Sequence, residues 1–149
     1  MKKQKPLWTC PKCKQTFVTR NIWHSCVRLD VDGFFKGSDP KARKLYDALL
    51  KLVRGFGPAK ENRIKSSINF QARVRFAGVS RITQNGLVCS FWLKRKIKSP
   101  RFLKTEFIPP NNYIYRFLLK ETSELDNEVK GWLEEAYSVG QQKSPQERN

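Results

Sequence analysis

The chain has 149 residues, of which 39% are hydrophobic and 12% aromatic, and its formal net charge is +17. This length and composition are typical of one folded domain with a small appendage, and they exclude wholesale disorder. No apolar stretch approaches the roughly 18 residues of a membrane-spanning helix, and the basic start lacks the apolar segment of a signal peptide, so we expect a cytoplasmic protein with reduced thiols and no membrane partner.

The first predicted element is a metal-binding unit within residues 1–30. The segment WTCPKCKQTFVTRNIWHSC holds four candidate ligands of one ion, namely Cys10, Cys13, His24 and Cys26. Thiolates and imidazole suit tetrahedral Zn²⁺, and Cys-Pro-x-Cys is a tight turn that presents two sulfurs together. A segment this short and basic buries too little apolar surface to fold without metal. We therefore predict a structural Zn²⁺ site, because four protein ligands leave no position for a reactive water.

This unit departs from a Cys2His2 zinc finger. Such a finger has about 12 residues before its first His and several more between its two His residues, whereas this segment ends in a His-x-Cys pair. Little room remains for a recognition helix, so base reading by a helix is not expected. Two roles stay open for the unit: a brace for the main domain, or phosphate contact through its basic side chains Lys12, Lys14, Arg20 and Arg28.

Two helices are predicted in the rest of the chain. Asp39 followed by Pro40 is typical of a helix start, and Gly55 of a helix end, with apolar residues at helical spacing between them. Ser123 predicts the start of a second helix, with Asp126 in a loose capping box and Gly140 at its end.

The residues between the two helices predict antiparallel strands. Apolar and polar residues alternate from Ile68 to Phe76, which is typical of a strand buried on one side. Asn85-Gly86 is a strong hairpin signal, and the returning strand follows over residues 87–97. Two further strands are expected around 102–108 and 113–119, joined by a Pro-Pro-Asn-Asn turn.

This order of elements predicts an α+β fold, in which an antiparallel sheet of about four or five strands is flanked by N- and C-terminal helices. The predicted organisation is a zinc-binding unit at 1–30, the α+β domain at 31–140 and a disordered polar tail at 141–149.

The positive charge is concentrated in the first two thirds of the chain. Residues 1–28 hold seven basic and no acidic side chains, and residues 36–104 hold 18 basic against three acidic ones. Residues 105–149 instead hold five basic against eight acidic side chains. A field of this size attracts polyanions, so we expect nucleic acid, either DNA or RNA, as the partner. The alternative is a solvated surface that only keeps the protein soluble.

A basic and aromatic sheet face is the predicted binding surface. If Ile68 faces the helices, Arg73 and Arg75 point the other way, as do Trp92 and Lys94 of the returning strand. Such a face clamps phosphates and stacks a base. In the alternative, the N-terminal unit covers Trp92 and the arginines make internal ion pairs, for which few acidic residues are available. With the basic run that follows, the predicted nucleic-acid-binding residues are Lys12, Lys14, Arg20, Arg73, Arg75, Trp92, Lys94, Arg95, Lys96, Lys98 and Arg101.

The sequence holds no recognisable catalytic motif. The single histidine is assigned to the metal, and there is no Gly-x-Ser-x-Gly, P-loop or His-Glu-x-x-His pattern. The carboxylates are scattered and form no compact nuclease-like pattern. We therefore expect binding without turnover.

Four blocks, WTCPKC…WHSC, LVRGFGP, INFQARVRFAGV and FWLKRKI, resemble a bacterial family of uncharacterised domains. That family is similar to the YdhG group, whose fold resembles frataxin, with an antiparallel sheet backed by two terminal helices. The resemblance covers residues 7–140 and implies no agreed activity, although fusion of related domains to nuclease-like domains points to nucleic acid. An iron role needs an acidic helix face. The first helix here is basic, so the resemblance implies no such role; its cations are Lys41, Arg43, Lys44, Lys51 and Arg54.

We therefore predict a zinc-stabilised, non-catalytic nucleic-acid-binding protein that uses a basic and aromatic sheet face with its neighbouring loops. The alternative is a binding module for an anionic small ligand or for a protein partner, again with structural zinc. A deep concavity around Trp92, rather than a flat basic face, would favour that alternative.

Overall fold

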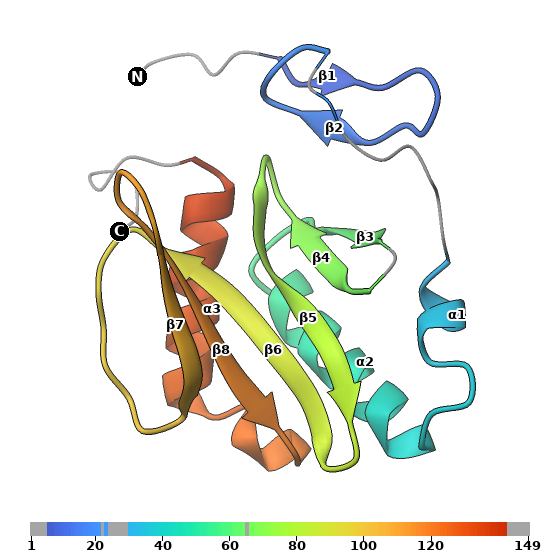
Figure 1. Ribbon diagram of the computed structural model, residues 1–149, viewed down its shortest axis with the longest axis vertical. Helices are drawn as coiled ribbons and strands as arrows, with labels where there is room; N and C mark the ends of the chain where they lie inside the picture. Colours follow the sequence, from blue (N-terminus) through green and yellow to red (C-terminus); the bar gives the residue numbers. More distant parts are fainter. Residues whose placement is uncertain (1–5, 22, 24–29, 65, 143–149) are drawn as a thin grey trace.

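The computed structural model of the protein describes residues 6–21, 23, 30–64 and 66–142. These form a six-stranded antiparallel sheet with two helices packed against one face, and a separate two-stranded hairpin near one end of the sheet (Figure 1). The fold is α+β, as the sequence predicts, with six strands in the main sheet where we expected four or five.

From residue 31 onward the helices and strands are joined by short connections. In chain order all the elements are β1 (Trp8–Thr9), β2 (Thr16–Phe17), α1 (Val31–Phe34), α2 (Pro40–Arg54), β3 (Lys60–Arg63), β4 (Ile68–Gln71), β5 (Arg75–Thr83), β6 (Gly86–Leu93), β7 (Phe102–Ile108), β8 (Asn112–Leu119), the 3-10 turn η1 (Thr122–Glu124) and α3 (Asn127–Gly140). The strand order of the main sheet is β3-β4-β5-β6-β8-β7. In the part of the chain that the structure describes, none of the helices has the length and apolar character to cross a lipid bilayer.

The two main helices differ in how well their starts were predicted. Asp39 caps α2 as expected, because its Oδ1 accepts a hydrogen bond from the Lys41 amide at 2.9 Å. The expected start of α3 at Ser123 is wrong, since Ser123 lies in η1. Asp126 is itself the cap of α3, and its Oδ1 accepts from the Val129 amide at 3.1 Å.

The single strand expected over residues 68–76 is two strands. β4 and β5 pair antiparallel and are joined by a turn at residues 72–74. The amides of Arg73 and Val74 donate to the Gly140 carbonyl at 2.9 and 2.8 Å, so the end of α3 holds the turn. Apolar residues on both sides of the turn face the helices, and the alternation therefore gives no sign of it. The remaining extra strand, β3, is polar throughout and carries no alternation to detect.

The hairpin between β5 and β6 turns one residue earlier than predicted. Its two-residue loop is Gln84-Asn85, and Gly86 is the first residue of β6. A Cβ at Gly86 would lie 2.0 Å from the carbonyl oxygen of Leu119 on β8, and its φ is +156°. Glycine is needed there because β8 approaches so closely.

Phe91 lies at the centre of the core between sheet and helices. Its side chain is fully buried, and its ring stacks on Trp132 of α3 with centroids 5.4 Å apart. Tyr115 and Phe117 of β8 contact the same ring at 5.3 and 6.0 Å. This aromatic cluster joins α3 to the middle of the sheet.

Several chain ends meet at one end of the domain, which we call the upper end after its place in Figure 1. Here β5 begins, β6 ends, β8 begins and α3 ends. The β1–β2 hairpin lies beyond this end of the sheet.

Candidate functional site

The N-terminal hairpin holds two of the four predicted metal ligands. β1 and β2 pair antiparallel, and the turn between them contains Cys10 and Cys13. The Lys14 amide donates to the Cys10 carbonyl at 2.9 Å, and the Cys10 amide donates to the Gln15 carbonyl at 2.8 Å. Both thiols are buried, and Cys13 Sγ accepts a hydrogen bond from Gln15 Nε2 at 3.1 Å. A tight turn with two buried thiols suits the chemistry of a Zn²⁺ site.

The other two predicted ligands, His24 and Cys26, lie outside the described residues, as does Arg28. Among the residues that the structure does describe, no group of three or more His, Cys, Asp or Glu side chains is arranged to hold a metal ion. The Zn²⁺ site therefore stays a prediction.

The hairpin docks on the upper end through two polar side chains of the main sheet. Gln71 is 3% exposed, and its Nε2 lies 2.9 Å from the Thr16 carbonyl oxygen and 3.0 Å from Thr16 Oγ1. Arg75 donates from Nη2 to Gln15 Oε1 at 2.9 Å, and its guanidinium lies 6.0 Å from the centre of the Phe17 ring. The hairpin thus covers part of the surface that we expected to be open.

Arg75 is a cation with a desolvated environment. Burial lowers the pKa of its guanidinium below the ordinary value. Among the described residues, no Asp or Glu lies within ion-pair distance of Arg75, and its guanidinium donates a hydrogen bond to the neutral side-chain amide of Gln15. A half-buried charge without a carboxylate partner is costly, so this position favours an anion beside it.

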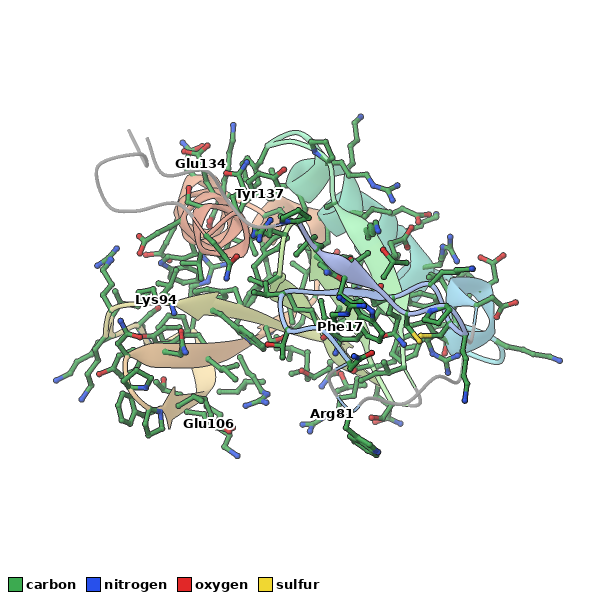
Figure 2. The ribbon with its side chains drawn as sticks, turned by 90° about the horizontal axis from the view of Figure 1, so that it is seen from above. Phe17, Arg81, Lys94, Glu106, Glu134 and Tyr137 are labelled. Carbon is green, nitrogen blue, oxygen red and sulfur yellow. The ribbon has the colours of Figure 1, made fainter. Side chains whose placement is uncertain are left out.

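A cavity of about 350 Å³ opens at the upper end next to Arg75. The described residues that line it are Val74, Arg75, Trp92, Lys94, Asn112, Val139 and Gln142. Arg75, Trp92 and Lys94 were predicted as binding residues, and the other four were not. None of these seven side chains is acidic. Lys94 Nζ donates to Asn112 Oδ1 at 2.6 Å, and Arg73 Nε donates to Gln142 Oε1 at 2.6 Å. Figure 2 views this end from above and shows Lys94 just beyond β6 and Phe17 on the hairpin.

The arrangement differs from the flat sheet face that we expected. Arg73 lies in the β4–β5 turn rather than on a strand. Trp92 is half-buried and lines the cavity. Asn112, Val139 and Gln142 could not be found from the sequence, because they join the site only where β8 begins and α3 ends.

Two of the predicted binding residues make internal ion pairs. Arg95 donates to both carboxylate oxygens of Glu135 at 2.9 and 2.8 Å. Arg101 contacts Asp126 at 3.1 Å and Glu128 at 3.0 Å, and its guanidinium lies 5.5 Å from the centre of the Trp132 ring. Both arginines therefore attach the segment after β6 to α3. The prediction from the sequence counted too few internal ion pairs, because the acidic partners of these arginines are concentrated at one helix far along the chain.

Six other predicted cations are exposed, and the described residues place no carboxylate within ion-pair distance of any of them: Lys12, Lys14, Arg20, Lys94, Lys96 and Lys98. Lys12, Lys14 and Arg20 belong to the N-terminal unit, whose hairpin lies beyond the upper end (Figure 1). The other three lysines follow β6, which ends at the upper end.

A second cavity, of about 540 Å³, lies between the N-terminal hairpin and β3. Its lining carries charges of both signs, including Lys14, Arg54 and Glu61. The Glu61 carboxylate accepts a hydrogen bond from the buried Tyr46 hydroxyl and pairs with Arg54 at 3.4 Å. Burial raises the pKa of Tyr46. Mixed charge makes this cavity a weaker anion site than the one at the upper end.

Replacing Tyr115 with Phe is expected to lower the free energy of unfolding by about 1–3 kcal/mol, because the partly buried amide of Ile97 is left without its acceptor. The Tyr115 hydroxyl accepts from the Ile97 amide at 2.7 Å and donates to the Arg95 carbonyl at 2.9 Å. Urea unfolding measures the loss, and amide hydrogen exchange at Ile97 should quicken. The matched variant Tyr113→Phe, on a less buried tyrosine, should leave Ile97 exchange unchanged.

Comparison with known proteins gives a family without an assigned activity. A family described as a domain of unknown function, DUF5655, matches residues 31–140. No curated protein and no solved structure gives a significant match. The expectation of an uncharacterised family is confirmed, and because the match covers most of the chain, this protein belongs to the DUF5655 family.

Proposed function

We propose that the protein binds nucleic acid, without turnover, through the upper end of its sheet and the N-terminal hairpin. The observation that carries this proposal is the group of exposed cations at the upper end and on the hairpin beyond it. The described residues place no carboxylate within ion-pair distance of Lys94, Lys96 or Lys98 after β6, nor of the three exposed cations of the N-terminal unit. A concentration of uncompensated positive charge at one end attracts a polyanion.

The internal ion pairs narrow the proposed contact set. Arg95 and Arg101 are assigned to the attachment of the post-β6 segment, because their guanidinium groups are engaged by Glu135, Asp126 and Glu128. The residues proposed for nucleic-acid contact are then Lys12, Lys14, Arg20, Arg73, Arg75, Trp92, Lys94, Lys96 and Lys98.

The proposal includes a structural Zn²⁺ held by Cys10, Cys13, His24 and Cys26. Support comes from the two buried thiols in one tight turn and from the spacing of the other two ligands. The metal's role would be to keep the hairpin folded so that Gln15 and Thr16 meet the sheet. We also retain the YdhG- and frataxin-like likeness as a proposal, on the ground that two helices near the ends of the domain back one antiparallel sheet.

A second candidate function is binding of an anionic small ligand. It is favoured by one observation, the cavity of about 350 Å³ around Arg75, Trp92 and Lys94. Its volume lies within the roughly 300–1,000 Å³ of small-ligand pockets.

Salt dependence tests the proposed function. A fluorescent single-stranded oligonucleotide, DNA or RNA, should bind at low salt and lose affinity on the order of 50-fold between 50 and 200 mM salt, as expected for about four phosphate contacts. Fluorescence anisotropy measures the affinity. No binding at low salt, or affinity indifferent to salt, overturns the proposal.

Charge-matched variants locate the surface. Replacing Lys94, Lys96 and Lys98 together with Gln should weaken oligonucleotide binding and reduce the slope of log affinity against log salt by about two. The matched control replaces three exposed lysines of α2 and α3 with Gln: Lys44, Lys51 and Lys130. Equal losses in both triple variants would mean that net charge, and not the upper end, governs binding.

A further inference from the structure

We propose that the cavity at the upper end is a binding site for a nucleoside phosphate, with the phosphate between Arg75 and Lys94 and the base against Trp92. This assignment deepens the proposed function, and it rests on that function where the ligand is part of a bound nucleic-acid strand. The shared chemistry is a phosphate ester joined to a planar ring. The source is either one nucleotide of a bound strand or a free nucleotide.

The anionic half of the ligand follows from the charges of the lining. The described lining residues include two cations, Arg75 and Lys94, and no carboxylate. Arg75 is desolvated, with a neutral amide as its hydrogen-bond partner, so a bound phosphate supplies the negative charge that the described residues do not place there. Lys94 is held in place by Asn112 at 2.6 Å. An ammonium group has three donors, and two remain for an oxyanion.

The planar half follows from the other walls of the cavity. Trp92 presents an indole that is neither fully buried nor fully exposed. Val74 and Val139 add apolar surface to the same lining. An aromatic ring beside aliphatic walls is the arrangement that stacks a base in single-strand readers. Inorganic phosphate alone has no apolar surface to place against these three side chains.

The size of the cavity and its position agree with one unit of ligand. About 350 Å³ is near the lower end of small-ligand pockets, so it admits one nucleotide and not a duplex. Lys96 and Lys98 follow Lys94 of the lining along the chain, and both are exposed. A strand that leaves one nucleotide in the cavity therefore meets further cations next to Lys94.

In the test, isothermal titration calorimetry measures the binding of five compounds to the zinc-loaded full-length protein at low salt. The compounds are AMP, UMP, adenosine, uridine and inorganic phosphate. We expect AMP or UMP to bind at least about 10-fold more tightly than the matching nucleoside or phosphate alone, since both halves of the site contribute. Nucleotides that bind no better than inorganic phosphate overturn the assignment of the ring, and nucleosides that bind as well as nucleotides overturn that of the phosphate.

Two variants assign the effect to the cavity. Trp92→Ala should weaken nucleotide binding about 10-fold, whereas Trp92→Phe should preserve most of it. Lys94→Gln should weaken the nucleotides but not the nucleosides. Arg75→Gln also removes the hairpin contact with Gln15, so the exposed Lys94 is the primary test of the anionic half.

The outcomes separate this proposal from the one it deepens. Oligonucleotide binding that is unchanged by Trp92→Ala, together with no mononucleotide binding, overturns the cavity site and leaves the proposed function standing. Mononucleotide binding without oligonucleotide binding supports the cavity site with a free nucleotide as its ligand and overturns the proposed function. Loss of both ligands in Trp92→Ala supports both proposals.

Discussion

Replacing Cys10 with Ser is expected to remove bound Zn²⁺ entirely and to detach the N-terminal hairpin from the upper end of the sheet. A serine hydroxyl does not replace a thiolate as a zinc ligand, and a segment this short has little apolar surface with which to fold alone. Zinc content of the purified protein, measured by atomic emission, should fall from about one ion per chain to none. Near-ultraviolet circular dichroism should report the loss of fixed packing between Trp8 and Phe17.

The matched control is Cys89→Ala. Cys89 is a buried core residue on β6, and burial raises the pKa of its thiol well above the ordinary value, so it stays protonated. Its replacement should leave the zinc content unchanged. If Cys10→Ser retains a full complement of zinc, the proposed metal site is wrong.

Cys10→Ser and a second variant together decide between the two roles of the hairpin. If the unit is only a brace, Cys10→Ser weakens oligonucleotide binding by loosening Gln71 and Arg75, and replacing Lys12, Lys14 and Arg20 with Gln does not. If the unit contacts phosphate directly, neutralising these three cations weakens binding while the zinc content stays intact.

Replacing Phe91 with Ala is expected to lower the free energy of unfolding by about 3–5 kcal/mol, the range for truncation of a fully buried aromatic side chain. The Phe91 ring contacts Trp132, Tyr115 and Phe117, so its removal leaves a cavity at the centre of the sheet–helix interface. Urea unfolding measures the change, and the midpoint of thermal unfolding should fall by roughly 10 °C.

Phe107→Ala is the matched control for this truncation. Phe107 lies on the edge strand β7 and is 51% exposed, so the same chemical change should cost under about 1 kcal/mol. Equal losses at the two positions would contradict the description of Phe91 as the centre of the core.

Local sequence signals predicted the elements whose causes are local. Asp39 caps α2 through its own neighbouring amide, and the Pro-Pro-Asn-Asn segment separates β7 from β8 as expected. The turn at residues 72–74 was missed because the amides of Arg73 and Val74 donate to the carbonyl of Gly140, which lies far away along the chain. No window of sequence around the turn contains that partner.

The candidate site divides in the same way. The sequence by itself determined that this protein is an α+β domain of high positive charge, with two cysteines in a tight turn and with Arg75 on β5 near Trp92 of β6 and the adjoining Lys94. Composition, periodicity and short-range turns carry that information. Only the tertiary structure decided that Arg95 and Arg101 pair with α3, that the hairpin covers Arg75, and that a cavity rather than a flat face surrounds Trp92. These outcomes depend on which carboxylates and which strand ends come to lie beside the cations, and burial and ion pairing bring them together only when the whole sheet and α3 have packed.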